Sequence, residues 1–167
     1  MSKTKKIALS GMLTALAFGL SYIEFLIPFD FGVPGVKLGL ANIVVMFALY
    51  SMGVGYAALI SLARITLSWL IFGSFTAFIY SLCGGILSLL IMILIKRINY
   101  FDEIGVSISG AFAHNIAQLA AASVITGAGA VFYYLPALTI AAVITGALNG
   151  EIIKTVLARI NRKKEKS

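Results

Sequence analysis

Charged side chains are scarce in this chain. Only 11% of its 167 residues are Asp, Glu, Lys or Arg, whereas 60% are hydrophobic. Soluble domains carry about 25% charged residues, so this composition and a mean hydropathy of +1.03 exclude an ordinary soluble fold. A helix needs about 20 apolar residues to cross the hydrocarbon core of a bilayer. The sequence therefore predicts an all-α integral membrane protein, a single membrane domain over residues 1–167 with room for roughly six crossings.

Residues that could do chemistry are equally few. The one cysteine, Cys83, lies in an apolar run, so no disulfide can form within the chain and we interpret it as a small packing residue. The one histidine, His114, has no cysteine or acidic neighbour with which to hold a metal. Asp102 and Glu103 form a lone acidic pair, without the second acidic cluster that would hold magnesium around a diphosphate. Because the sequence also has no catalytic triad, phosphate-binding glycine loop or ATPase motif, we expect no enzyme activity, cofactor or metal.

The basic residues define a topology. They flank apolar runs instead of covering a surface with interleaved aromatics, so the net charge of +7 does not indicate nucleic-acid binding. With six crossings, every lysine and arginine except Lys37 and Arg64 falls on one side, and the positive-inside rule then places both termini in the cytoplasm. The expected location is the cytoplasmic membrane. The expected helices cover about residues 7–27, 38–51, 56–72, 75–95, 105–126 and 134–160.

Small residues recur on one face of the first expected helix, where Gly11, Ala15 and Gly19 are spaced by four. In lipid, apolar burial gives no driving force between helices, so a face of small residues favours close packing. We expect this face to dock against another helix, either inside the bundle or in a partner subunit.

Polar residues inside the apolar runs are costly in hydrocarbon unless they find partners. His114, Asn115 and Gln118 lie in the fifth expected helix, and His114 and Gln118 share a face because they are four residues apart. This patch is either an interhelical hydrogen-bond clamp or part of a ligand site.

Arg64 is expected near the middle of the membrane, where it either pairs with Glu24 or binds an anion. Lys37 lies at the external mouth, where a lysine most often snorkels. With Asn42 and Arg64 it nevertheless gives an inward path of polar groups suited to a phosphate, a carboxylate or another polar ligand. The candidate ligand-binding residues are Lys37, Asn42, Arg64, Tyr80, His114, Asn115 and Gln118.

Five motifs carry a family resemblance: residues 34–42 (PGVKLGLAN), 63–64 (AR), 80–85 (YSLCGG), 114–118 (HNIAQ) and 134–136 (YLP). Through them the chain resembles, from the first helix to the sixth, the Gx transporter family, also labelled heptaprenyl diphosphate synthase component I. That family is similar to the substrate-binding S components of energy-coupling factor vitamin transporters. Those six-helix proteins pair with a transmembrane coupling subunit and two ATPases.

The resemblance implies roles for these features. The small-residue face would dock the coupling subunit, the ligand would lie toward the external side, and the S component would topple in the membrane to release it inside. Relatives are associated with flavin-based extracellular electron transfer and quinone metabolism, which implies a flavin or an isoprenoid precursor as cargo. The synthase label implies a different role, a non-catalytic accessory subunit of a prenyl diphosphate synthase or redox system, although the paired aspartate-rich motifs of prenyl synthases are missing.

The polar residues of the fifth expected helix lie at different depths in the membrane, so we expect them to have different roles. In the expected topology this helix runs outward, so Gln118 lies nearer the external mouth than His114 does. We expect Gln118 to contact the ligand directly. His114 and Asn115 are expected to brace the helix against Asn149 and the glycines of the sixth helix.

Overall fold

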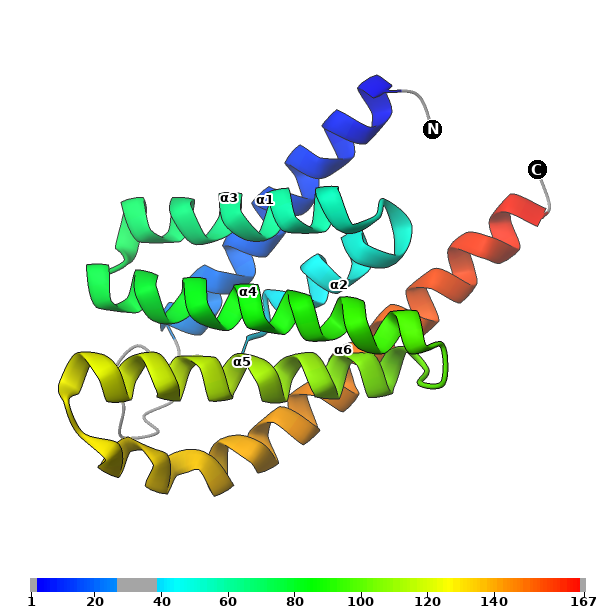
Figure 1. Ribbon diagram of the computed structural model, residues 1–167. Coiled ribbons are helices and arrows are strands. Elements are labelled where there is room, and N and C mark those ends of the chain that lie inside the picture. Colours follow the sequence, from blue (N-terminus) through cyan, green and yellow to red (C-terminus); the bar gives the residue numbers. More distant parts are fainter. Residues whose placement is uncertain (1–2, 27–38, 166–167) are drawn as a thin grey trace.

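The computed structural model describes residues 3–26 and 39–165, and within them every regular element is a helix (Figure 1). This confirms the predicted all-helical fold. Lys37 and most of the motif at residues 34–42 lie outside the described residues. The elements are α1 (Lys3–Leu26), α2 (Asn42–Ser51), α3 (Val54–Phe72), α4 (Phe75–Ile98), α5 (Glu103–Thr126), the 3-10 helix η1 (Gly129–Tyr134) and α6 (Leu135–Glu165).

The long helices form a bundle in which α3, α4 and α5 lie side by side, α6 packs against α5, and α1 packs against α3 (Figure 1). Both ends of the chain and the α4–α5 turn lie at the same end of the bundle. The flanking basic residues therefore gather at one end, as the topology requires. The side of the membrane that this end faces stays a prediction.

α2 differs from the other helices in length. It has 10 residues, where the sequence predicted a helix over 38–51. At 1.5 Å per residue it is about 15 Å long, half of the roughly 30 Å of a hydrocarbon core. Five other helical stretches in the described part of the chain are long and apolar enough to cross. The chain is thus a multi-pass membrane protein, but α2 by itself does not supply the sixth full crossing.

Local sequence explains where several helices begin and end. Asp102 caps the start of α5 by accepting a hydrogen bond from Gly105 N at 3.0 Å, and Ser74 caps α4 in the same way through Ala77 N at 3.1 Å. The left-handed backbone of Gly127, with a φ of 66°, ends α5. These caps fix the turns between the long helices.

Glycines allow the α5–α6 pair to approach closely. A Cβ added to Gly146 would lie 2.6 Å from the Cα of Ile108, and one added to Gly150 would lie 2.5 Å from the Cα of Ile104. Both neighbours are backbone atoms that cannot give way, so only glycine fits. This is the small-residue packing expected of helices in lipid.

The apolar core forms around α2, because its short length lets the long helices surround it. Val45, Met46 and Leu49 of α2 are each 1% exposed, and Ile60 of α3 is fully buried against them. In contrast, many leucines and isoleucines of the long helices are exposed, as a surface in contact with lipid requires. α2 also places its first residue, Asn42, at the centre of the polar site described below.

Candidate functional site

Arg64 is the centre of a buried polar cluster. It lies on α3 and is 4% exposed. Its Nη1 donates to Ser21 Oγ of α1 at 3.3 Å, and its Nη2 donates to Asn42 Oδ1 of α2 at 3.1 Å. Its Nε has no hydrogen-bond partner among the described residues. A buried guanidinium thus joins three helices, and its Nε donor has no partner in the described part of the chain.

Asn42 connects this cation to the rest of the cluster. Its Nδ2 lies 3.3 Å from His114 Nδ1 of α5 and 3.5 Å from Ser88 Oγ of α4. Because Arg64 donates to Oδ1, the amide orientation is fixed and Nδ2 can only donate. His114 Nδ1 is then an acceptor, so the neutral ring carries its proton on Nε2.

A glycine on α4 makes room for the polar residues of α5. A Cβ on Gly84 would lie 2.8 Å from His114 Cε1 and 3.0 Å from Gln118 Cγ. His114 is 2% exposed and Gln118 is fully buried, so both side chains lie between the helices and not at the lipid surface. The motif YSLCGG therefore supplies a recess for the motif HNIAQ.

Asn115 braces α6, as predicted, but at a different position. Its Nδ2 donates to the backbone carbonyl of Leu138 at 2.9 Å, whereas the expected partner was Asn149. The glycines of α6 pack instead on the first half of α5, at Ile104 and Ile108. His114 lies against Asn42 of α2 and Gly84 of α4.

Glu24 anchors the chain ahead of α2. It is 7% exposed, and its Oε1 accepts a hydrogen bond from the backbone N of Leu40 at 2.8 Å. The carboxylate is also close enough to Arg64 to attract the guanidinium electrostatically. Glu24 therefore fixes the backbone just before α2. Both predicted roles of Arg64, an ion pair with Glu24 and the binding of an anion, stay open.

Two candidate ligand-binding residues, Tyr80 and Lys37, are not part of the polar cluster described above. Tyr80 is 2% exposed and packs with Leu119, Ala122 and Leu138 in an apolar cluster between α4, α5 and α6. Lys37 lies outside the described residues. The sequence analysis missed Ser21, whose only signal was its spacing of three from Glu24 on one helical face.

The small-residue face of α1 does not pack inside the bundle. Among the described residues, a Cβ on Gly11 or Gly19 would meet no atom within 4 Å, and Ala15 is exposed. Gly11 and Ala15 line an open groove of about 540 Å³ between α1 and α3, with Phe18, Leu59 and Leu67 among its walls. Of the two predictions for this face, docking inside the bundle is therefore wrong.

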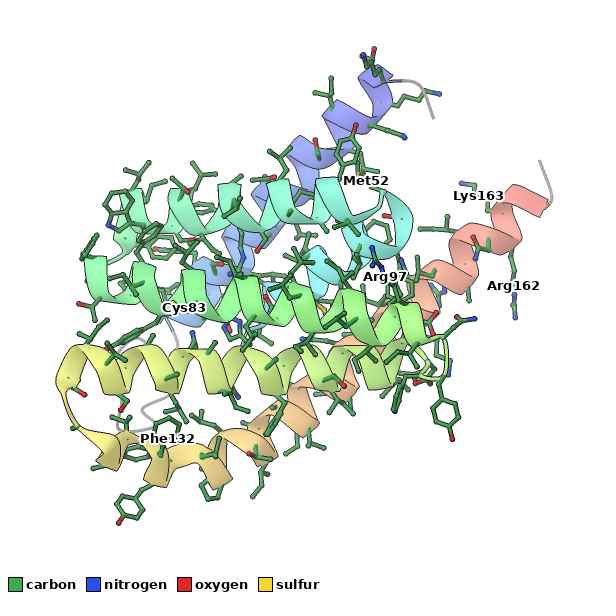
Figure 2. All side chains as sticks on the ribbon, in the orientation of Figure 1. Met52, Cys83, Arg97, Phe132, Arg162 and Lys163 are labelled. Atoms are coloured by element: carbon green, nitrogen blue, oxygen red, sulfur yellow. The ribbon has the colours of Figure 1, made fainter. Side chains whose placement is uncertain are left out.

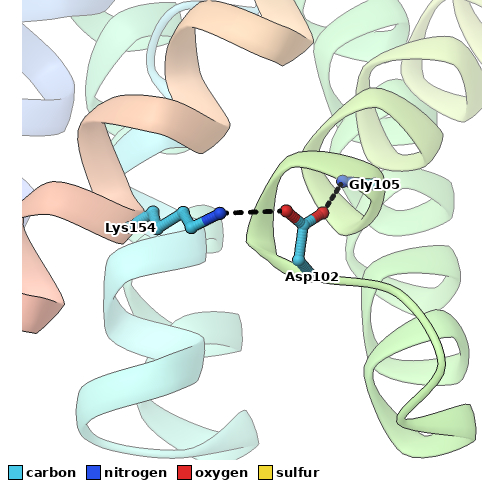
Figure 3. A network of polar contacts seen from close by, with 3 residues as sticks. All are labelled: Asp102, Gly105 and Lys154. Carbon is cyan, nitrogen blue, oxygen red and sulfur yellow. Dashed lines mark hydrogen bonds and ion pairs between the residues drawn. The ribbon is translucent and has the colours of Figure 1, made fainter.

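The lone acidic pair has a structural use (Figure 3). Asp102 Oδ2 forms an ion pair with Lys154 Nζ of α6 at 3.2 Å, while its Oδ1 caps α5 at Gly105. The hydrogen bond from the Gly105 backbone, and then the one from Lys154, hold the pKa of Asp102 below its usual value. Across residues 3–26 and 39–165, no three His, Cys, Asp or Glu side chains gather as a metal site would need.

Taken together, long apolar helices around a buried, hydrogen-bonded cation define a multi-pass membrane protein with a polar centre. The chain belongs to the family described as heptaprenyl diphosphate synthase component I, the Gx transporter family, whose family model matches residues 13–156. The resemblance found in the sequence is thereby confirmed. Comparison with curated proteins and with solved structures gives no significant match.

Proposed function

We propose that this protein is the substrate-binding subunit of an energy-coupling-factor-type transporter and binds a small polar or anionic molecule in the cytoplasmic membrane. The observation that carries the proposal is Arg64. An ionised arginine inside a membrane bundle is costly and in most cases marks a ligand or ion site. Two of its nitrogens have partners, and its Nε has none in the described part of the chain.

The neighbours of Arg64 suit a ligand that carries both an anionic group and hydrogen-bonding groups. A phosphate or carboxylate would take the guanidinium, while Asn42, His114 and Gln118 offer amide and imidazole groups to the rest of the molecule. A flavin and an isoprenoid or quinone precursor both meet this description. Since these side chains are nearly fully buried, the ligand reaches them only when a neighbouring segment moves aside.

The exposed face of α1 suits a partner helix. Gly11, Ala15 and Gly19 offer small residues beside an open groove between α1 and α3. Lacking an ATPase motif, the chain would depend on a transmembrane coupling subunit that docks here and on two ATPases bound to that subunit. A Cβ at Gly11 would meet no atom of the described residues within 4 Å, so the open groove has room for Gly11→Leu. We expect this variant to abolish co-purification of the coupling subunit and leave the fold intact.

A second candidate function is a non-catalytic accessory subunit of a prenyl diphosphate synthase or redox system. The description of the family favours it, and so do the exposed basic residues at one end of the bundle, which offer a surface to a soluble partner. Co-purification from native membranes separates the two. Recovery of ATPases with a coupling subunit supports transport, and recovery of a synthase alone supports the accessory role.

Direct binding tests the main proposal. Purified protein is titrated with a panel of flavins, other vitamins and isoprenoid diphosphates, and the same titration is run on Arg64→Lys and Arg64→Gln. Loss of a charged hydrogen bond of about 1.5–3 kcal/mol corresponds to roughly 10- to 100-fold weaker binding. Arg97→Gln is the matched control, because it removes the same charge from an exposed position.

The thermal unfolding of each variant is measured alongside its affinity. Arg64→Lys keeps the buried charge, so it separates lost binding from a lost fold. Saturable binding that Arg64→Lys and Arg97→Gln weaken equally, or an absence of saturable binding across the panel, would count against the proposal.

A further inference from the structure

A second apolar groove lies on the other flank of α1, and neither the ligand site nor the α1–α3 groove uses it. α1 and α6 do not pack against each other anywhere in the described part of the chain, although both contact α2. Figure 1 shows the N-terminal half of α1 and the C-terminal half of α6 projecting from the bundle at the same end. The space between them, floored by α2, has a volume of about 230 Å³ and is lined by Leu13, Leu16, Ile43, Val44, Phe47, Ile152, Ile153 and Val156.

Basic residues continue the walls of this groove toward the chain ends. On α6, Val156, Arg159 and Lys163 are spaced by three and four, so they follow one helical face. Figure 2 shows Lys163 on the side of α6 nearer to α1 and Arg162 pointing to the opposite side. On α1, Lys5 is exposed and lies about two turns before Leu13, nearer the chain end.

A basic residue, Lys96, also lies beside the end of α2, the helix that forms the floor of the groove. Lys96 Nζ donates to the carbonyl of Leu49 at 2.9 Å, near the C-terminus of α2, and lies 4.2 Å from the centre of the Tyr50 ring. At this end of the bundle, each of the three helices that form the groove, α1, α2 and α6, therefore has a positive charge on it or beside it.

We propose that this groove binds an acyl chain of an anionic phospholipid, with the lipid phosphate among Lys5, Arg159 and Lys163. The lining is entirely aliphatic or aromatic, and the groove is open at its side. A flexible hydrocarbon chain suits an open and wholly apolar groove, and the charge around the mouth selects an anionic headgroup.

The bound lipid would have a mechanical consequence. Because α1 and α6 both pack on α2 but not closely on each other in the described residues, a lipid between them supplies packing that the helix pair lacks. We therefore expect anionic lipid to raise the thermal stability of the protein above its value in zwitterionic lipid.

The experiment compares phosphatidylglycerol with phosphatidylcholine of the same acyl chains. The full chain is incubated with each lipid in detergent, and retained lipid is counted by native mass spectrometry. Each basic residue near an anionic headgroup contributes about fivefold to binding. We expect phosphatidylglycerol to be retained preferentially, and Lys163→Ala to weaken its retention about fivefold. Arg162→Ala is the matched control, since it removes the same charge one residue away.

The groove itself is tested by filling it. Val156→Trp should displace the lipid, whereas Ile144→Trp, at an exposed position elsewhere on α6, should not. Unfolding of each variant in phosphatidylcholine checks that its fold is retained. Equal retention of the two lipids, equal effects of Lys163→Ala and Arg162→Ala, or release of a stoichiometric polypeptide by Val156→Trp would each overturn the proposal.

Discussion

Gly84 is the position where one added methyl group probes the buried cluster most directly. Its Cβ would lie 2.8 Å from His114 Cε1, 2.9 Å from His114 Nδ1 and 3.0 Å from Gln118 Cγ. Carbon atoms in contact normally stay about 3.5–4.0 Å apart, so the imidazole ring must move. A ring that moves also disturbs its 3.3 Å contact with Asn42 Nδ2. The substitution therefore strains the α4–α5 packing and the polar cluster together.

We expect Gly84→Ala to lower the free energy of unfolding by about 1–3 kcal/mol, the usual cost of an extra methyl group in a packed core. The better helix propensity of alanine offsets at most about 1 kcal/mol of this. The assay is a titration with sodium dodecyl sulfate in mixed micelles, followed by circular dichroism. Gly85→Ala is the matched control, because its Cβ would meet Ile65 Cδ1, the flexible end of a side chain, at 2.9 Å.

A double-mutant cycle identifies the cause of the destabilisation. If the clash with the imidazole dominates, Gly84→Ala costs much less when His114 is already alanine, with a coupling of about 0.5–3 kcal/mol. A cost that is the same in both backgrounds, or no greater than that of Gly85→Ala, would refute the assignment of Gly84 as the recess for His114.

Three further predictions concern the cluster and the basic end of the bundle. Gln118→Ala should weaken ligand binding, whereas His114→Ala should chiefly lower stability; equal binding losses with unchanged stability would contradict this division. Asp102 has a lowered pKa in the folded protein, so its stabilising effect is full above the unfolded value of about 3.9 and is lost as the pH falls through the folded value. Thermal unfolding between neutral and acidic pH should show this loss, and Asp102→Asn should show less pH dependence. Lys96→Met removes the hydrogen bond to the Leu49 carbonyl and should cost about 1.5–3 kcal/mol of unfolding free energy, with Arg97→Met as the exposed control.

Composition and periodicity predicted the long helices well, because each depends on residues close together in the chain. The expected helix at 75–95 corresponds to α4, and the one at 105–126 to α5. Helix ends differed by a few residues where capping decides them, as at Asp102. The length of α2 was missed, because apolar composition alone does not distinguish a buried helix from a crossing one.

The pairing of polar residues was less predictable. The sequence identified Arg64 and His114 as costly in lipid without partners, and Asn42 as part of a polar path, and the structure joins all three. It did not reveal that Asn42 links the other two, since His114 lies 72 positions away and the contact depends on how α2 and α5 rotate about their axes. Ser21 was missed because serine in a membrane helix is common and carries no charge.

Asn42 links the stability of the cluster to any binding role that Arg64 has. In the described residues, Asn42 Oδ1 accepts a hydrogen bond from Arg64 Nη2. An anionic ligand would bind the same guanidinium group. A ligand that displaces this oxygen must replace the hydrogen bond before it gains any affinity, so a stronger brace implies weaker binding. If Arg64 is purely structural, the Asn42–Arg64 hydrogen bond does not compete with a ligand. Removing Asn42 then only destabilises the bundle. A change in ligand affinity in Asn42→Ala therefore indicates a site that opens to bind, whereas a loss of stability with unchanged affinity indicates a clamp that stays closed.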